Sequence, residues 1–550
     1  MNTPESHTPK NNRILMIIAA ILVVAICAAA VFVVIKTVLK DNAGISGGGN
    51  GETPNGTTAP TVDPVVEGEK LKNTIAIKIG QHNINAVELN YYYVEMVQNF
   101  CQEYYYYIYY YGMIDPNKPL NQQVFDKETG ETWADYFLGV SKDGLKSTYL
   151  LCDQANKNGY SLSESDQKYL ATVRETIERY ATQYKYADVN SYLVDIYGYG
   201  ADIDSYMAYS ERALLADSYY RNYADSLTYT GEELREFEGD KAHTYNSYTY
   251  ATYYLDPAKF LTGGTEDSDG KITYTDEQKA AALKAAEEVA KSLNGSNCQD
   301  LDAFNSLILG LDINSNLTSV KVGENTDQLY AAIDTRFQEW LSSSDRAYGD
   351  VAYIAKTSTN ANKEEVVEGY YIIWFGGIND NMFQLKDVRH ILVMFKNAEG
   401  KTYSDGITSF TPEQKEAAKL AAEQLLEVWK SGEMTEDSFA ALATKKTEDT
   451  GSAATGGLYQ NIYPGQMVEG FEKWCYDPDR QIGDTGLVES VYGYHIMFFV
   501  GDSDTTYRDY MVSYNLRNED LSKWHEALMA TVELEEICLD YCKLDMKLSG

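Results

Sequence analysis

Two histidines stand on strand-like segments of the chain. The protein has only six histidines in 550 residues, with His390 inside residues 388–393 and His495 inside residues 492–496. A neutral imidazole donates a hydrogen bond from one ring nitrogen and accepts one at the other, so two imidazoles can exchange these roles. The pattern leaves two interpretations open: a polar reaction site, or structural histidines that link neighbouring strands.

Other residue patterns that could carry chemistry are weaker. Seven cysteines show no zinc-binding spacing, and for Cys538 and Cys542 two packed thiols are favoured over a disulfide or half of a metal site. The G-x-S-x-G pattern at residues 44–48 has no strand before it and no helix after it, so it is not a nucleophile elbow. Residues 267–270 could be a calcium loop or a tight hairpin turn. The hairpin is favoured, because Thr265 stands where the first ligand is required.

The charge of the chain restricts the classes of partner. Its 46 basic and 82 acidic residues give a net charge of −36, which repels phosphate backbones, so nucleic-acid binding is not expected. A hydrophobic content of 44% excludes wholesale disorder, and 550 residues predict about three or four domains. Tyrosine supplies 47 of the aromatic residues, which suits contact with polypeptide or sugar.

Both histidines lie in the second copy of an internal repeat. Residues 268–270 and 275–279 recur as 404–406 and 411–415 at an offset of 136, six residues spread over 337–350 recur within 471–484 at an offset of 134, and 369–372 recur as 493–496 at an offset of 124. The first copy therefore holds ten more residues in the loop before its last strand. Each copy predicts an α+β unit of strand, loop, long helix, short helices and strand.

The long helix of the second copy has clear signals. Thr411 is the expected N-cap, Pro412 follows at the first helical position, and Gln414 completes a capping box. Its expected apolar stripe consists of Ala417, Ala421, Leu425 and Val428.

The N-terminal region predicts a membrane anchor. Residues 14–35 form an uncharged apolar run of 22 residues, close to the roughly 20 needed to cross a bilayer as a helix. A cleaved signal peptide is the alternative, because residues 28–30 are small alanines, but the run continues past them. The Gly-, Thr- and Pro-rich residues that follow predict a flexible linker.

Residues 73–240 predict a helical domain. They open with an alternating strand at 74–79 and continue with long helical stretches that carry tyrosines at 91–93 and 104–111. A buried seam between helices is favoured for these tyrosines, and a surface that binds other polypeptides remains the alternative.

The motifs of the second copy resemble those of parvulin-type peptidyl-prolyl isomerases of the PrsA/SurA-like extracytoplasmic foldases. The resemblance covers residues 386–501 and rests on Arg389 to Val393, Phe439, Leu442, Ala443, Asp449, Gly456-Gly457, Gly465-Gln466-Met467, Phe471, and Tyr492 to Ile496. One departure is that the family's G-G-D-L-G is here Gly456-Gly457-Leu458-Tyr459-Gln460.

This resemblance implies the roles of the site residues. His390, Asp449 and His495 would form the polar catalytic core, without a metal or another cofactor. The substrate, and above all its proline ring, would be bound by Met467, Phe471, Tyr459 and Tyr492.

The first copy lacks these polar residues. Carried across at constant offset, His390 falls on Tyr254, Asp449 on Asn314 and His495 on Tyr371, and Gly465-Gln466-Met467 has no counterpart. We therefore expect an inactive parvulin-like domain.

The resulting expectation is an α+β multidomain protein with a helical SurA/PrsA-like chaperone domain, two parvulin-like domains of which the first is degenerate, a C-terminal helix and an N-terminal transmembrane helix. The expected limits are 1–13 for the cytoplasmic N-terminus, 14–35 for the transmembrane helix, 36–72 for the linker, 73–240 for the chaperone domain, 243–378 and 386–502 for the parvulin-like domains, and 503–550 for a C-terminal helical segment that packs on the chaperone domain.

The expected function is that of a single-pass cell-membrane isomerase and chaperone, with its large domain on the extracytoplasmic side, acting on unfolded or partly folded secreted polypeptides that contain X-Pro bonds. The alternatives are a non-catalytic holdase of the same architecture and, more distantly, a surface adhesin or glycan-binding protein.

Overall fold

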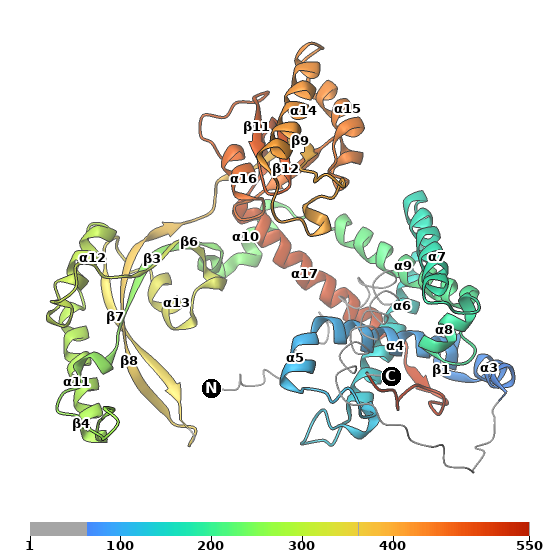
Figure 1. Ribbon diagram of the computed structural model, residues 1–550, viewed down its shortest axis with the longest axis horizontal. Helices are drawn as coiled ribbons and strands as arrows, with labels where there is room; N and C mark the ends of the chain where they lie inside the picture. Colours follow the sequence, from blue (N-terminus) through green and yellow to red (C-terminus); the bar gives the residue numbers. More distant parts are fainter. Residues whose placement is uncertain (1–62, 361, 549–550) are drawn as a thin grey trace. The chain divides into compact units, whose positions relative to one another are not determined.

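The computed structural model describes residues 63–360 and 362–548 (Figure 1). These residues divide into two compact units. Unit 1 contains the described residues up to Thr228 together with those from Arg517 onward, and unit 2 spans Tyr229–Leu516. The predicted transmembrane helix and most of the linker lie outside the described residues. Within the described part of the chain, no helix is long and apolar enough to cross a membrane. The sequence limits expected for the individual domains stay predictions.

Unit 1 is mainly helical, as expected for residues 73–240. Its helices are α3 (Pro64–Asn73), α4 (Ala86–Glu103), α5 (Tyr105–Tyr111), α6 (Trp133–Lys157), α7 (Glu164–Gln183), α8 (Val189–Tyr197) and α9 (Ile203–Ser226), and its strands are β1 (Ile75–Ile79), β2 (His82–Asn85) and β13 (Leu534–Glu536). Side-chain caps at the N-termini of the long helices, such as the capping box of Thr132 and Asp135 on α6, satisfy backbone N–H groups that lack helical partners.

The tyrosines of unit 1 fall into two groups. Tyr91 and Tyr93 on α4 are fully buried, so the prediction of a seam between helices is confirmed there. It is wrong for α5, where Tyr106, Tyr110 and Tyr111 are more than half exposed. The physical reason is that α5 ends after two turns at Gly112, in the left-handed conformation, and buries only Ile108.

The described residues from Arg517 onward belong to unit 1 with the helical domain, whereas residues 503–516 of the expected C-terminal segment belong to unit 2. Strand β13 pairs antiparallel with β1 and extends the sheet to the order β13-β1-β2, so the expectation of a purely helical tail is wrong at these residues. The free edge of β1 supplies the hydrogen bonds that this segment needs. The buried His525 lies 2.7 Å from the Ser147 hydroxyl, from its ring Nε2 to Oγ.

Unit 2 contains two modules, each built on a four-stranded antiparallel sheet. The first module comprises β3 (Ser247–Leu255), the hairpin β4 (Thr265–Glu266) and β5 (Ile272–Thr273), α11 (Asp276–Leu293), α12 (Leu301–Leu309), β6 (Gly323–Leu329), α13 (Thr335–Ser342), β7 (Val351–Thr359) and β8 (Glu365–Asn379). The second comprises β9 (Gln384–Met394), α14 (Pro412–Lys430), α15 (Glu436–Lys446), β10 (Leu458–Ile462), α16 (Glu469–Cys475), β11 (Thr485–Glu489) and β12 (Gly493–Thr506). Helices α10 (Gly231–Glu238) and α17 (Tyr507–Met529) flank the modules in the chain.

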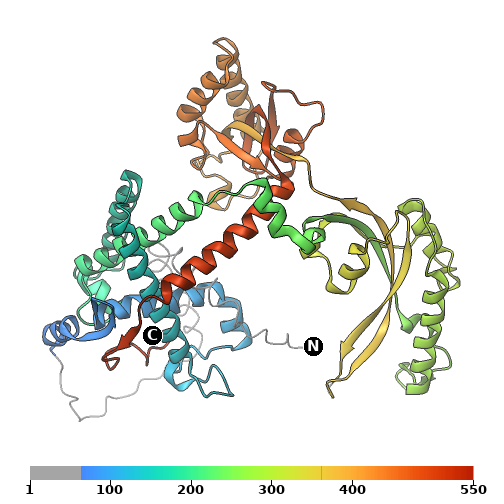
Figure 2. The ribbon, with the colours of Figure 1, turned by 180° about the vertical axis from the view of Figure 1, so that it is seen from behind.

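The sheets of the two modules have the same topology. Their strand orders are β6-β3-β8-β7 and β10-β9-β12-β11, so each strand of one has a counterpart at the same place in the other. In the first module, α11 and α12 cover one face of the sheet and α13 the other, as both views show (Figures 1 and 2). The ten additional residues of the first copy lengthen the β7–β8 hairpin.

Helix α14 begins as predicted, with Thr411 as N-cap, Pro412 at the first position and a capping box to Gln414. The predicted apolar stripe is wrong by one residue. The buried side chains are Ala418, Ala422, Leu426 and Trp429, whereas Ala417 and Val428 are exposed. Both registers carry small and apolar residues, and burial of the large Trp429 ring against Phe439 and Phe498 decides which one faces the sheet.

A buried carboxyl group ties three helices of unit 1 together. Glu95 on α4 accepts hydrogen bonds at Oε1 from the hydroxyls of Tyr197 (2.5 Å) and Tyr206 (3.0 Å), at the end of α8 and the start of α9. Burial raises the pKa of Glu95 to about 7, an effect that the two phenol donors only partly offset.

We predict that Glu95→Gln stabilises unit 1 at high pH. Because the folded-state pKa of Glu95 lies above its unfolded value, the contribution of the protonated acid is fully present below about pH 4.5 and is lost as the pH rises through about 7. An uncharged amide avoids this loss, so the variant should gain roughly 1–3 kcal/mol at pH 8 and little at pH 4.5. Urea unfolding followed by fluorescence across this range measures the difference. The exposed Glu103→Gln on the same helix is the control, and equal pH dependence of the Glu95 variant and wild type would contradict the prediction.

Candidate active site

The antiparallel pairing of β9 with β12 brings the two predicted histidines together. His390 is opposite Met497, and His495 is opposite Leu392. Since side chains two apart on a strand share a face, His390 and His495 point to the same side of the sheet. Their Nδ1 atoms are 3.1 Å apart, and both residues are at most 5% exposed.

Asp449 reaches His390 because the loop after α15 is hydrogen-bonded to β9. The amide of Leu392 donates to the Thr447 hydroxyl at 3.0 Å, and the amide of Glu448 donates to the Leu392 carbonyl at 2.9 Å. These bonds place the next residue, Asp449, with its Oδ2 atom 2.9 Å from Nε2 of His390.

The Oδ2 atom of Asp449 is the centre of a hydrogen-bond cluster. Besides His390, it accepts from the hydroxyls of Ser452 at 2.5 Å and Tyr459 at 3.0 Å. At the other end of the histidine pair, Nε2 of His495 lies 2.8 Å from the Ser490 hydroxyl. These six polar side chains form one continuous chain of hydrogen bonds through the pair of imidazoles, which we call the polar chain.

The electrostatics keep the carboxyl ionised and one imidazole neutral. The hydrogen bond from His390, joined by those from Ser452 and Tyr459, holds the pKa of Asp449 well below its usual range despite partial burial. Burial and the neighbouring His390 lower the pKa of His495 to about 3.

An ionised Asp449 orders the protons along this chain. A carboxylate only accepts hydrogen bonds, so Nε2 of His390 carries a proton. With both imidazoles neutral, Nδ1 of His390 accepts from Nδ1–H of His495, whose Nε2 then accepts from Ser490. A proton added at Nδ1 of His390 would reverse the donor and acceptor roles between the rings.

An apolar wall lies beside the polar chain. Phe471 on α16 is 2% exposed and meets both imidazoles edge to face, with ring centroids 5.5 Å from His390 and 5.3 Å from His495. The partly buried Met467 and Tyr459 pack in the same hydrophobic cluster. The structure therefore brings together His390, Asp449, His495, Phe471, Met467 and Tyr459.

Strand β10 carries Tyr459 close to His390 because a glycine precedes the strand. Gly457 accepts the backbone N–H of His390 at 2.8 Å and has φ +73°, and a Cβ atom there would lie 2.1 Å from the His390 carbonyl oxygen. Only glycine fits this approach.

Tyr492 occupies a different place from that expected. Its ring packs against Tyr403, with centroids 5.0 Å apart, and no described contact joins this ring to the histidines. Its backbone N–H donates to the Ser490 hydroxyl at 3.1 Å.

Two serines of the site, Ser452 and Ser490, were not predicted from the sequence. Single serines in turns carry no sequence pattern that marks them, and only the nearness of Ser452 to Asp449 could have indicated one.

The first module has a sheet with the same strand order, but its counterparts of the two histidines are not histidines. Tyr371 meets Phe337 edge to face at 5.1 Å, as His495 meets Phe471, which supports the expected match of Tyr371 with His495. From this anchor, the pairing of Ile373 with Thr252 places Thr252 at the position of His390, so the match with Tyr254 is wrong by two residues. A constant offset fails here because the two β3 and β9 segments are followed by loops of different length.

The other two expected differences also change in detail. Asn314 is buried and accepts from the Tyr253 hydroxyl, whose ring belongs to the core on the α11 and α12 side of the sheet, so it does not stand in for Asp449. At the offset of 134, Ile333 takes the place of Met467 and packs with Phe337, although Gly465-Gln466 has no counterpart. The first module therefore retains apolar residues at the positions of Met467 and Phe471.

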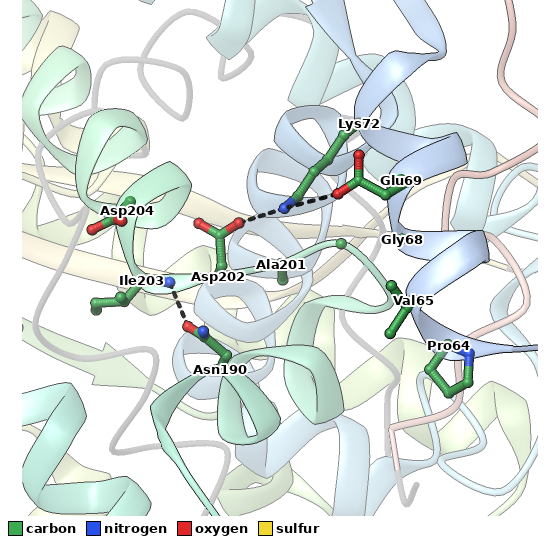
Figure 3. Close-up of a pocket in the computed structure, with 11 residues that line it drawn as sticks. Pro64, Val65, Gly68, Glu69, Lys72, Asn190, Ala201, Asp202, Ile203 and Asp204 are labelled. Carbon is green, nitrogen blue, oxygen red and sulfur yellow. Dashed lines mark hydrogen bonds and ion pairs between the residues drawn. The ribbon is translucent and has the colours of Figure 1, made fainter.

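A cavity of about 450 Å³ in unit 1 is not this site (Figure 3). Its charged groups are satisfied locally, since Lys72 lies between Glu69 and Asp202, and Asp204 pairs with Arg174 outside the cavity. Among residues 63–360 and 362–548, no three His, Cys, Asp or Glu side chains are grouped as metal ligands would be.

Comparison with known proteins shows which protein family the second module resembles. Residues 372–501 match the family model described as the PPIC-type PPIase domain. Foldase protein PrsA 3 of Bacillus cereus is 34% identical over 125 residues, covering 21% of this chain and 42% of the relative, and Foldase protein PrsA 1 of Listeria innocua is 39% identical over 64 residues, covering 12% and 22%. The chain thus spans less than half the length of these curated relatives.

The solved structure of PrsA from Bacillus subtilis is also similar, at 22% identity and a TM-score of 0.19, covering 29% of this chain and 54% of that chain. The family match coincides with the residues that hold the histidine pair, Asp449 and Phe471. This chain therefore carries a PPIC-type, or parvulin-type, peptidyl-prolyl isomerase domain of the kind found in PrsA foldases.

Proposed function

We propose that this protein is a peptidyl-prolyl cis-trans isomerase that acts on unfolded or partly folded polypeptides, with the second module as its catalytic centre. The observation that carries the proposal is the ordered chain Asp449–His390–His495–Ser490 beside the buried ring of Phe471. The family match over residues 372–501 supports the same reaction.

The residue types suit the rotation of an X-Pro bond. Amide resonance sets a barrier of about 20 kcal/mol, so a catalyst must bind the twisted amide better than either planar form. In the twisted state the nitrogen becomes a hydrogen-bond acceptor and the carbonyl oxygen loses its conjugation. Phe471 and Met467 can hold the proline ring, while two imidazoles that exchange donor and acceptor roles follow this change of polarity without a covalent step.

A non-catalytic holdase of the same architecture is the second candidate. It is favoured by the first module, which lacks the polar chain, and by the exposed tyrosines of α5, which offer an aromatic surface outside the isomerase site. The adhesin or glycan-binding alternative rests on those tyrosines alone.

We predict that His390→Ala and His495→Ala each lower kcat/KM for an X-Pro peptide by about 100-fold, because each removes one end of the ring-to-ring hydrogen bond. Exchange NMR of the peptide with the purified protein measures the rate. His82→Ala in unit 1, remote in the chain from the second module, is the matched control and should keep wild-type activity.

The double variant His390→Ala/His495→Ala separates the candidates further. Activity at the level of solvent alone would agree with an inactive first module. Substantial residual activity would place isomerisation in the first module, and a wild-type protein no faster than solvent would leave the holdase as the function.

We also propose that residues 14–35 anchor the protein in the cell membrane with the large domain on the extracytoplasmic side. The uncharged run of 22 apolar residues and the polar linker after it support this arrangement. The clients would then be translocated polypeptides that still have to fold.

Deletion of residues 14–35 should release the protein from sedimented membranes, since the hydrophobic segment is lost. Deletion of residues 38–59, of equal length in the polar linker, is the control and should leave the protein membrane-bound. Protease added to intact cells should digest the wild-type domain. Sedimentation of the first deletion variant with membranes, or full protection from protease, would contradict the anchoring proposal.

A further inference from the structure

The hydroxyl of Tyr459 contacts the carboxylate of Asp449, and the sequence pattern did not predict this contact. In the family pattern an apolar residue follows the acidic one at this place, whereas here Leu458 and Tyr459 follow the two glycines. The Tyr459 hydroxyl donates to Oδ2 of Asp449 at 3.0 Å, the same oxygen that faces Nε2 of His390 at 2.9 Å.

The ring and the hydroxyl of Tyr459 face different groups. The ring centroid is 5.1 Å from that of His390 and 6.4 Å from that of Phe471, so the ring forms part of the wall around the imidazole. The hydroxyl is the third donor on one carboxylate oxygen, after His390 and Ser452. A side chain without this hydroxyl could form the wall but could not contact the carboxylate.

We propose that Tyr459 is a positioning residue that acts through Asp449, keeping this carboxylate ionised and directed at His390 and thereby extending the activity of the site to lower pH. The inference rests on the proposed isomerase function and adds a determinant of its pH range. A third donor on Oδ2 favours the charged carboxylate over the neutral acid, and the ordered protons of the histidine pair depend on that charge.

Other charged groups near Asp449 do not replace this effect. Glu448 pairs with Lys396, and Arg389 pairs with Glu436, so both basic side chains are engaged by carboxylates of their own. His495 lies on the far side of His390 and acts on Asp449 only through space. On Oδ2 the hydrogen bonds of Tyr459 and Ser452 therefore support the His390 contact, while Oδ1 accepts from the backbone N–H of Gly451 at 3.1 Å. In agreement, burial and the nearby Asp449 charge raise the pKa of Tyr459 to about 12, so the phenol remains a donor at neutral pH.

The test compares Tyr459→Phe with Tyr459→Leu in the complete protein. For the Phe variant we expect the acid limb of the kcat/KM profile to move up by about half to one pH unit, with KM unchanged because the ring wall remains. The Leu variant should show the same shift together with a higher KM, since it also loses the ring. Tyr476→Phe removes the phenol donor to the Ile462 carbonyl, at 2.7 Å, and is the matched control that should leave the pH profile in place.

A second readout does not need catalysis. The carboxyl carbon of Asp449, assigned in ¹³C NMR spectra with Asp449→Asn, should titrate at higher pH in Tyr459→Phe than in wild type and Tyr476→Phe. An unchanged titration would overturn the inference, as would an unchanged acid limb. A wild-type protein without isomerase activity would refute the proposed function, while the NMR titration would still decide the role of Tyr459.

Discussion

The pairing register of β9 and β12 is the constraint on which the site depends. It places His390 and His495 on one face of the sheet, with 3.1 Å between their Nδ1 atoms. A slip of one residue would turn one imidazole to the opposite face, among Ile391 and Ile496 in the core under α14 and α15. That apolar core on the one face and Phe471 on the other therefore hold the register that the chemistry requires.

Burial of two imidazoles and a carboxylate is costly unless each polar atom has a partner. Here the chain from Asp449 to Ser490 supplies those partners, so the groups are oriented before any substrate binds. The first module makes the comparison from within the same chain. It has the same strand order and an equivalent contact between Phe337 and Tyr371, yet Asn314, the expected counterpart of Asp449, bonds to Tyr253 on the opposite face of the sheet. The frame alone does not produce the polar chain.

Local signals in the sequence were enough for much of this structure. The repeat, the capping box at Thr411 and the motifs around His390 and His495 predicted the modules and most of the site, because each depends on neighbours in the chain. Features that depend on distant contacts were missed. The sequence matched His390 with Tyr254, and only the sheet register shows that its counterpart is Thr252. The roles of Ser452 and Ser490 depend on the folded turns that bring them to Asp449 and His495. The exposure of the α5 tyrosines depended on what packs beside that helix.

Long-range ¹H–¹⁵N spectra of the histidine rings report which nitrogen of each ring carries the proton. We expect His390 to carry its proton on Nε2 and His495 on Nδ1, and we expect an X-Pro peptide to change the signals of both rings. Protons on Nε2 of both rings, or signals that a saturating peptide leaves unchanged, would contradict an ordered histidine pair as the centre of the site.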